Sequence, residues 1–177
     1  PRRRELLAGL DIDYRVTALP EVDESYPDTL SGEEIPLYIS QEKAAAYRRF
    51  MKDNTLLITA DTIVWLDGKV YGKPRDIADA KAMLQALSGK THTVITGVTL
   101  TSLQKQISFA VSTEVTFATL GDDEIDYYVE KYRPLDKAGA YGVQEWIGYI
   151  GVTGLKGSYY NVMGLPIQRL YTELKKF

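Results

Sequence analysis

An aspartate in the middle of an apolar, β-branched run is the first candidate for chemistry in this sequence. Residues 56–65 read LLITADTIVW, a composition typical of a strand that is buried on both faces. An ionised carboxylate is almost never buried without a partner, because its transfer out of water is unfavourable. Asp61 is therefore expected to pair with cations or to lie at a strand end that opens into a polar cleft, as a base or a metal ligand. A turn-capping aspartate is the alternative.

Two arginines near the beginning of the sequence could bind an anionic ligand. Pro1 is expected to begin a helix, because the missing N–H of proline costs nothing at the first helical position. Arg2 and Arg3 then stand at the positive end of the helix dipole, where negative charge is favoured. A helix N-terminus with arginines suits a phosphate, so an anion site is predicted here, with a solvated helix as the alternative.

Two lysines could reach the carboxylate of Asp61. Lys43 lies at the edge of the apolar stripe of a helix expected over about residues 34–51, so its ammonium either extends to water or reaches a buried anion. The Asp-Gly pair at residues 67–68 is a strong signal for a two-residue hairpin turn. This hairpin would bring Lys73 back toward Asp61.

Two further segments could complete a site for a phosphorylated ligand. The acidic loop over residues 20–27 contains Glu24, which is either a solvated loop residue or a carboxylate that binds Mg²⁺. Residues 139–164 hold seven of the fourteen glycines, and glycines cluster where the backbone turns sharply or approaches a ligand. Just inside this segment, Gln144 offers one acceptor and one donor group, which suits the edge of a nucleobase.

The elements that must position these residues follow from periodicity and turn residues. His92, the only histidine, is expected at the surface or at a strand end and is left out of the site. The expected elements are a short strand over 14–19, the helix over 34–51, a helix over 77–87 that is capped by Asp76 and ends at Gly89, strands over 91–103 and 106–120, a helix over 124–132 that is capped by Asp122, and a terminal helix that opens at 164–166 and runs to about 174.

Composition narrows the class of protein. The 177 residues are 45% hydrophobic and 25% charged, which is ordinary for one globular domain, possibly split into two lobes. The net charge of −3 argues against nucleic acid or a membrane surface as a partner. No apolar run approaches the length of a membrane span, and no signal peptide is visible. The absence of cysteine excludes disulfides and is compatible with a cytoplasmic location.

Several short motifs, in order along the whole chain, resemble those of the Maf family, the septum-formation-inhibitor-like nucleoside triphosphate pyrophosphatases. No Walker A, GxGxxG or GxSxG motif competes with them. The motifs are residues 1–7 (PRRRELL), 23–24 (DE), 42–44 (EKA), 60–64 (ADTIV), 72–76 (GKPRD), 87–89 (LSG), 136–144 (DKAGAYGVQ) and 161–166 (NVMGLP).

The resemblance implies an α/β fold like that of inosine triphosphate pyrophosphatases. In that fold a mixed, elongated central sheet has flanking helices, and two lobes surround an active-site cleft. We therefore expect one Maf-like domain over residues 1–177, usually as a homodimer. The family begins with a strand and a Ser-x-Ser segment before Pro-Arg-Arg, so this N-terminal strand is expected to be absent from the chain.

The resemblance also implies an activity. It predicts hydrolysis of a nucleoside triphosphate to the monophosphate and pyrophosphate, dependent on Mg²⁺ or Mn²⁺. The form of residues 137–144 resembles the branch that acts on dTTP and UTP, with modified pyrimidine nucleotides as a further possibility. The alternative, from another class, is a nucleotide-binding regulator of septum formation or cell division that turns nothing over.

Residue roles carry over position by position. The resemblance makes Asp61 the proton acceptor, and Glu24, Lys43 and Lys73 match other active-site positions. Substrate choice is implied for Arg2, Thr62 and Gln144. Residue chemistry adds two expectations: Arg2, Arg3, Lys43 and Lys73 bind the triphosphate, while Glu24 and Asp61 are the candidate metal ligands, either of which could hold the ion.

Overall fold

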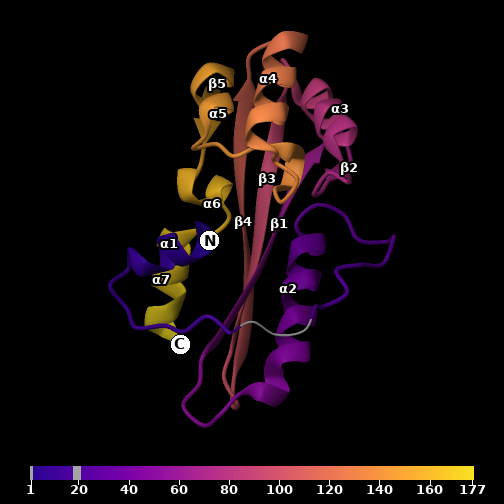
Figure 1. Cartoon of the computed structure of the whole chain (residues 1–177). Helices are drawn as coiled ribbons and strands as arrows, with labels where there is room; N and C mark the ends of the chain where they lie inside the picture. The colour runs from indigo at the N-terminus through magenta and orange to yellow at the C-terminus, as the bar shows by residue number, and fades with distance from the viewer. Residues whose placement is uncertain (1, 18–20) are drawn as a thin grey trace. The chain divides into compact units, whose positions relative to one another are not determined.

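The computed structural model of the chain describes residues 2–17 and 21–177, and its sheet has the strand order β2-β1-β3-β4-β5 (Figure 1). The strands are β1 (Leu57–Leu66), β2 (Lys69–Tyr71), β3 (Thr91–Thr101), β4 (Gln106–Phe117) and β5 (Val152–Lys156). The helices are α1 (Arg2–Ala8), α2 (Glu34–Tyr47), α3 (Ile77–Leu87), α4 (Asp122–Tyr132), α5 (Trp146–Gly151), α6 (Tyr159–Met163) and α7 (Ile167–Lys176), with short 3₁₀ turns at Arg48–Phe50 and Ala138–Ala140. The predicted α/β class is confirmed.

The chain divides into two compact units, which agrees with the predicted lobes. Unit 1 comprises Pro1–Thr62, Ile95–Val111 and Gly164–Phe177, and unit 2 comprises Ile63–Val94 and Ser112–Met163. The expectation of one domain over residues 1–177 stays a prediction. Within the described residues, no helix combines the length and the apolar character that a membrane crossing requires.

The sheet segment of unit 1 carries different helices on its two faces. Side chains alternate between the faces of a strand, and this alternation sorts the residues of β1 and β3. One face packs against α1 and α7 through a cluster of buried apolar side chains. The cluster consists of Ala60, Val98, Leu100, Phe109, Leu165 and Leu170.

The other face of this sheet segment packs against α2. A glycine makes the approach close: a Cβ atom at Gly97 would lie 2.5 Å from the carbonyl carbon and oxygen of Pro36 and 2.6 Å from the nitrogen of Leu37. Ile35 and Ile39, both buried, provide apolar contacts for α2. The backbone of the helix therefore rests directly on β3 at Gly97.

Unit 2 contains the predicted hairpin and the predicted helix that follows it. β1 and β2 pair antiparallel, with Trp65 opposite Val70, across a turn at residues 67–68 whose φ angles are both positive. Asp76 caps α3 by accepting a hydrogen bond from the backbone N–H of Asp79 at 2.8 Å. Helices α3, α4 and α5 contribute to a second core, whose fully buried members include Leu84, Leu87, Ile125, Val129 and Ile147.

Three predictions about local structure were wrong or cannot be followed. Residues 14–17 form no strand, and residues 18–20, like Pro1, lie outside the described part of the chain. Asp122 does not cap α4 but lies in its first turn. The N-cap is Gly121, whose backbone N–H donates to Glu124 Oε1 at 2.7 Å.

Sequence reasoning placed His92 correctly near a strand end but missed its burial, and it left the glycine-rich segment without elements. His92 lies near the start of β3 but is only 1% exposed, with its ring edge-to-face against Phe117 and Tyr141. Its Nε2 shares a 2.6 Å hydrogen bond with the hydroxyl of Tyr141, whereas its Nδ1 is buried without a hydrogen-bond partner among the described residues. Residues 139–164 contain α5, β5 and α6, elements too short to produce a readable periodicity.

The close approach at Gly97 generates a stability prediction. Gly97→Ala should lower the free energy of unfolding by about 2–3 kcal/mol, because the atoms in the way are backbone atoms that cannot rotate aside. Urea unfolding measures the change. Gly72→Ala is the matched control, since a Cβ there would meet nothing within 4 Å. Equal stability of the two variants would show that α2 is free to shift away.

Candidate active site

Asp61 lies in mid-strand on β1 and is 8% exposed. The strand continues to Leu66, so the expectation of a strand end was wrong, and a turn-capping role is excluded. Asp61 follows the alternation that places Thr59 on the α2 side of the sheet. The carboxylate is therefore presented to α2, and the predicted pairing with a cation is observed there.

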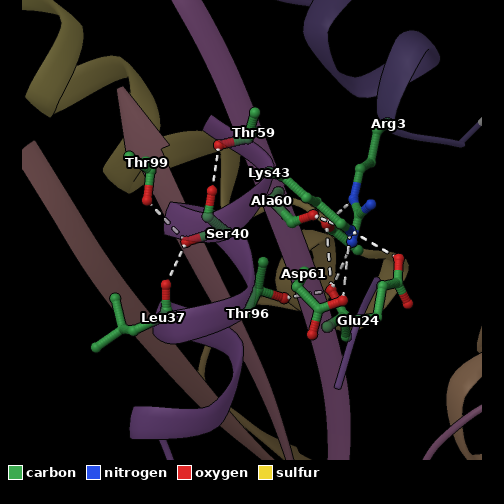
Figure 2. Close-up of polar contacts among 12 residues, drawn as sticks. Arg3, Glu24, Leu37, Ser40, Lys43, Thr59, Ala60, Asp61, Thr96 and Thr99 are labelled. Carbon is green, nitrogen blue, oxygen red and sulfur yellow. Dashed lines mark hydrogen bonds and ion pairs between the residues drawn. The ribbon is translucent and has the colours of Figure 1, made fainter. Parts of the chain in front are cut away.

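Lys43 is that cation, and it binds several acceptors at once. Its Nζ lies 3.0 Å from the carbonyl oxygen of Ala60, 3.2 Å from Glu24 Oε1 and 3.5 Å from Asp61 Oδ1. Figure 2 shows the lysine side chain reaching from α2 toward both carboxylates. Of the two alternatives for Lys43, contact with a buried anion is the one observed. Glu24, from the acidic loop, is the more exposed of its two acidic partners.

The surroundings of Asp61 raise the pKa of its carboxyl. Burial raises the pKa of this carboxyl above its ordinary value, and the nearby charge of Glu24 acts in the same direction. Lys43 and Arg3 favour the ionised form, but their effect on the pKa is smaller than that of burial. A carboxylate with a raised pKa is a stronger base, which is the property that a proton acceptor needs.

Thr62 points to the opposite face from Asp61, where Arg3 meets it. The guanidinium of Arg3 donates from one terminal nitrogen to Thr62 Oγ1 at 3.1 Å and from Nε to the carbonyl oxygen of Gly164 at 2.8 Å. Thr62 Oγ1 also lies 2.8 Å from Thr96 Oγ1. Arg3 thus joins α1, β1 and the segment before α7, a role that its sequence motif did not reveal.

The two predicted anion-binding arginines differ in their contacts. Arg3 is held by Thr62 and Gly164, whereas Arg2 makes no hydrogen bond or ion pair with any described residue. Arg2 is nevertheless only half-buried, so its guanidinium is available to an incoming ligand. The contacts therefore favour Arg2 over Arg3 as a direct ligand of phosphate.

Lys73 and Gln144 belong to unit 2. Lys73 is exposed and follows Gly72, whose carbonyl oxygen accepts a hydrogen bond from the N–H of Gly139 at 3.1 Å. Gln144 is half-buried, and its Oε1 is buried without a hydrogen-bond partner among the described residues. A buried acceptor without a donor is unfavourable, so a ligand with an N–H group would remove this cost.

The segment around Gln144 is held firmly. The hydroxyl of Tyr128 accepts a 3.0 Å hydrogen bond from the N–H of Gly142 and donates a 2.6 Å hydrogen bond to Glu145 Oε1. Tyr141 is bonded to the buried His92. The residues on both sides of Gln144 therefore have fixed partners, which limits the positions open to its amide.

Two carboxylates could take part in a metal site. Glu24 and Asp61 both lie within ion-pair distance of Lys43 Nζ, so their oxygens converge on one region. Over residues 2–17 and 21–177, no group of three or more histidine, cysteine, aspartate or glutamate side chains could hold a metal ion. Mg²⁺ at phosphate sites commonly uses one or two carboxylates together with substrate phosphates and water, and the pair fits that kind of site.

The chain is similar to known proteins over nearly all of its residues. A family model described as "Maf-like protein" matches residues 1–177. A "dTTP/UTP pyrophosphatase" of Phocaeicola vulgatus is 67% identical over 176 residues, which cover 99% of this chain and 91% of the relative. Proteins with the same name are 64% identical in Bacteroides thetaiotaomicron (99% and 91% covered) and 55% identical in Porphyromonas gingivalis strain W83 (100% and 90% covered).

The different contacts of the two arginines generate opposite predictions. Arg3→Ala should lower the melting temperature, because it removes the two hydrogen bonds by which Arg3 joins α1 to Thr62 and to the carbonyl oxygen of Gly164. Arg2→Ala should leave the melting temperature nearly unchanged and weaken the binding of inorganic triphosphate instead. Thermal unfolding with and without triphosphate measures both effects. If Arg2→Ala is the less stable variant, the assignment of roles is reversed.

The buried His92 generates a pH prediction. Burial lowers its pKa to about 4, so between pH 6.5 and 4 the unfolded chain binds a proton that the folded chain does not. The free energy of unfolding should therefore decrease as the pH is lowered from 6.5 to 4, by about 3 kcal/mol in all. Urea unfolding of His92→Gln, which cannot titrate, should show a weaker pH dependence over the same range. Identical slopes would mean that His92 is protonated in the folded protein.

Proposed function

Because the chain belongs to the Maf family, we propose that it hydrolyses dTTP and UTP to the nucleoside monophosphates and pyrophosphate. The relatives named "dTTP/UTP pyrophosphatase" are similar to this chain over nearly its full length. One structural observation supports the proposal at the level of individual residues. It is the buried Asp61, whose pKa is raised and whose carboxylate shares the ammonium of Lys43 with Glu24.

In this proposal the cationic residues bind the triphosphate. Most of the catalysis of phosphoryl transfer comes from positioning and from neutralisation of charge on the phosphate oxygens. Lys43 is held in place by Ala60 and the carboxylates, and the free guanidinium of Arg2 can add bidentate contacts. Lys73, exposed on unit 2, is a further phosphate ligand in the proposal.

Asp61 acts as the base. It orients a water molecule and accepts its proton while the oxygen attacks phosphorus in line with the departing pyrophosphate. The raised pKa makes the carboxylate a better acceptor than an exposed aspartate. Lys43 holds the carboxylate in position and favours its ionised form before the reaction.

We further propose a divalent cation, Mg²⁺ or Mn²⁺, as the cofactor. Glu24 and Asp61 would hold it together with the phosphates of the substrate. When bound, the ion would neutralise charge on the phosphate oxygens and lower the pKa of water. Which carboxylate contributes more to metal binding stays open in this proposal.

Gln144 is the proposed contact to the base. Uracil and thymine share an imide N–H between two carbonyl groups, and a primary amide can accept from the N–H and donate to a carbonyl. The buried Oε1 of Gln144 lacks a donor among the described residues, which favours a ligand with an N–H group. Thr62, which the resemblance also connects with substrate choice, is already bound to Arg3 and Thr96.

The alternative is a nucleotide-binding regulator of septum formation or cell division without turnover. A buried carboxylate whose desolvation is unfavourable favours the enzyme, because a regulator that only binds nucleotide has no use for a base. The homodimer, a cytoplasmic location, the absence of nucleic-acid partners and an action on modified pyrimidine nucleotides stay predictions.

Asp61→Asn tests the proposal. The variant keeps the shape of the side chain but cannot accept the proton, so pyrophosphate release from dTTP and UTP should fall by about 10²–10⁴-fold. It should stay folded, with a melting temperature at neutral pH equal to or above that of the wild type. The charge that burial disfavours is gone, and Lys43 keeps Glu24 and Ala60 as partners.

The assay uses saturating Mg²⁺ and a panel of canonical and modified nucleoside triphosphates. Asp126→Asn, an exposed aspartate on α4, is the control and should be as active as the wild type. Near-normal turnover in Asp61→Asn would contradict the assignment of the base. Tight nucleotide binding by the wild type without pyrophosphate release would favour the regulator instead.

A further inference from the structure

Buried hydroxyl groups hold α2 on the sheet of unit 1. Ser40, on α2, is fully buried, and its Oγ lies 2.7 Å from the hydroxyl of Thr99 on β3. The hydroxyl of Thr59 on β1 donates a 2.8 Å hydrogen bond to the carbonyl oxygen of Ser40. Figure 2 shows these bonds reaching Ser40 from two strands. One residue of the helix is therefore held by two strands at once.

This contact lies next to the contact that holds the active-site lysine. Lys43 comes three residues after Ser40, so both side chains lie on the same side of α2. Along β1, Thr59 is followed directly by Ala60 and Asp61, the two residues of this strand that Lys43 contacts. The helix and the strand thus meet at two neighbouring points, one made of hydroxyls and one made of charges.

The hydroxyl contact at Ser40 constrains the position of Lys43 in the charged contact. A lysine side chain has several rotatable bonds, and its ammonium can bridge two carboxylates only if its Cα is correctly placed. The hydroxyl bonds fix the helix along the strand, and the contact of Gly97 with Pro36 and Leu37 fixes its distance from the sheet. A displacement of about 1 Å at a reacting centre can cost on the order of a hundredfold in rate.

We infer that Thr59 and Thr99 are positioning residues for Lys43. Their hydroxyl groups hold α2 so that Lys43 Nζ stays between Asp61 and Glu24. Both threonines are buried, at 5% and 0% exposure, and they act through the helix rather than on the substrate. The catalytic part of this inference rests on the proposed function of Lys43.

A matched control separates positioning from general stability. Thr101 is a buried threonine on β3, like Thr99, but the bond of its hydroxyl is to Gln106 Nε2 at 3.0 Å. Thr101→Val therefore loses a buried hydroxyl without changing a bond to α2. Thr59→Val removes the bond to Ser40 at constant shape, and Thr59→Ser keeps it.

The experiment has two measurements. The first is kcat and KM for pyrophosphate release from dTTP with Mg²⁺, at a temperature where every variant is folded. The second needs no substrate: amine-specific labelling of Lys43, quantified by peptide mass spectrometry relative to the exposed Lys52. Lys43 is well covered, with 15% of its side chain exposed, so its labelling reports whether the ammonium stays in place.

Thr59→Val is expected to lower kcat on the order of tenfold while KM changes by about twofold at most, because charge neutralisation matters most in the transition state. Its Lys43 should be labelled several-fold faster, and Thr99→Val should behave alike. Thr59→Ser should restore both quantities, and Thr101→Val should match the wild type in both.

Two results would each contradict one of the two hypotheses. If Thr59→Val matches Thr101→Val in kcat and in Lys43 labelling, the hydroxyls only stabilise the fold and the inference is overturned. If labelling changes as expected but no protein, including the wild type, releases pyrophosphate from any nucleotide, positioning of Lys43 is supported and the proposed function fails. The two hypotheses are thus tested separately.

Discussion

The burial of one carboxylate is the constraint on which unit 1 depends. Asp61 lies in an apolar strand, and burial raises its pKa in spite of a neighbouring ammonium. A charge in this position can be retained only if a cation stays close. Lys43 has to come from a helix that packs tightly on the sheet, and Gly97 together with the hydroxyls around Ser40 provides that packing. The fold of this unit thus provides the conditions under which a buried carboxylate can exist.

The alternation of a β-strand separates two tasks that neighbouring residues perform. Asp61 faces α2 and meets Lys43, while Thr62 faces the α1 and α7 side and meets Arg3. Consecutive residues of one strand therefore contact two different helices. Arg3 still influences the carboxylate electrostatically, since it favours the ionised form of Asp61. Two consecutive residues of β1 thus contact Lys43 on one face of the sheet and Arg3 on the other.

The parts of the site that the sequence could predict are those with a strong local signal. Asp61 was recognisable because a carboxylate interrupts an apolar run, and Lys43 because a lysine borders an apolar helical stripe. The anchoring of Arg3 by Gly164 was not predictable, because it joins residues 161 positions apart and one partner is a backbone carbonyl. The burial of His92 was missed for a similar reason: it depends on Phe117 and Tyr141, which come from distant segments. Periodicity describes the environment of one element and not its distant partners.

The charges around Lys43 indicate why such a site would need additional cations when a substrate binds. In the ligand-free protein one ammonium is shared by two carboxylates, so this group already carries an excess of negative charge if both are ionised. In the proposed function a triphosphate would add several negative charges to the same region, and each like charge makes ionisation of Asp61 less favourable. Arg3 cannot move to compensate without leaving Thr62 and Gly164. The proposed function would therefore use free cations: Arg2, which has no partner among the described residues, and the proposed divalent ion. By neutralising the phosphates, they would also keep Asp61 ionised, the state in which it can accept a proton.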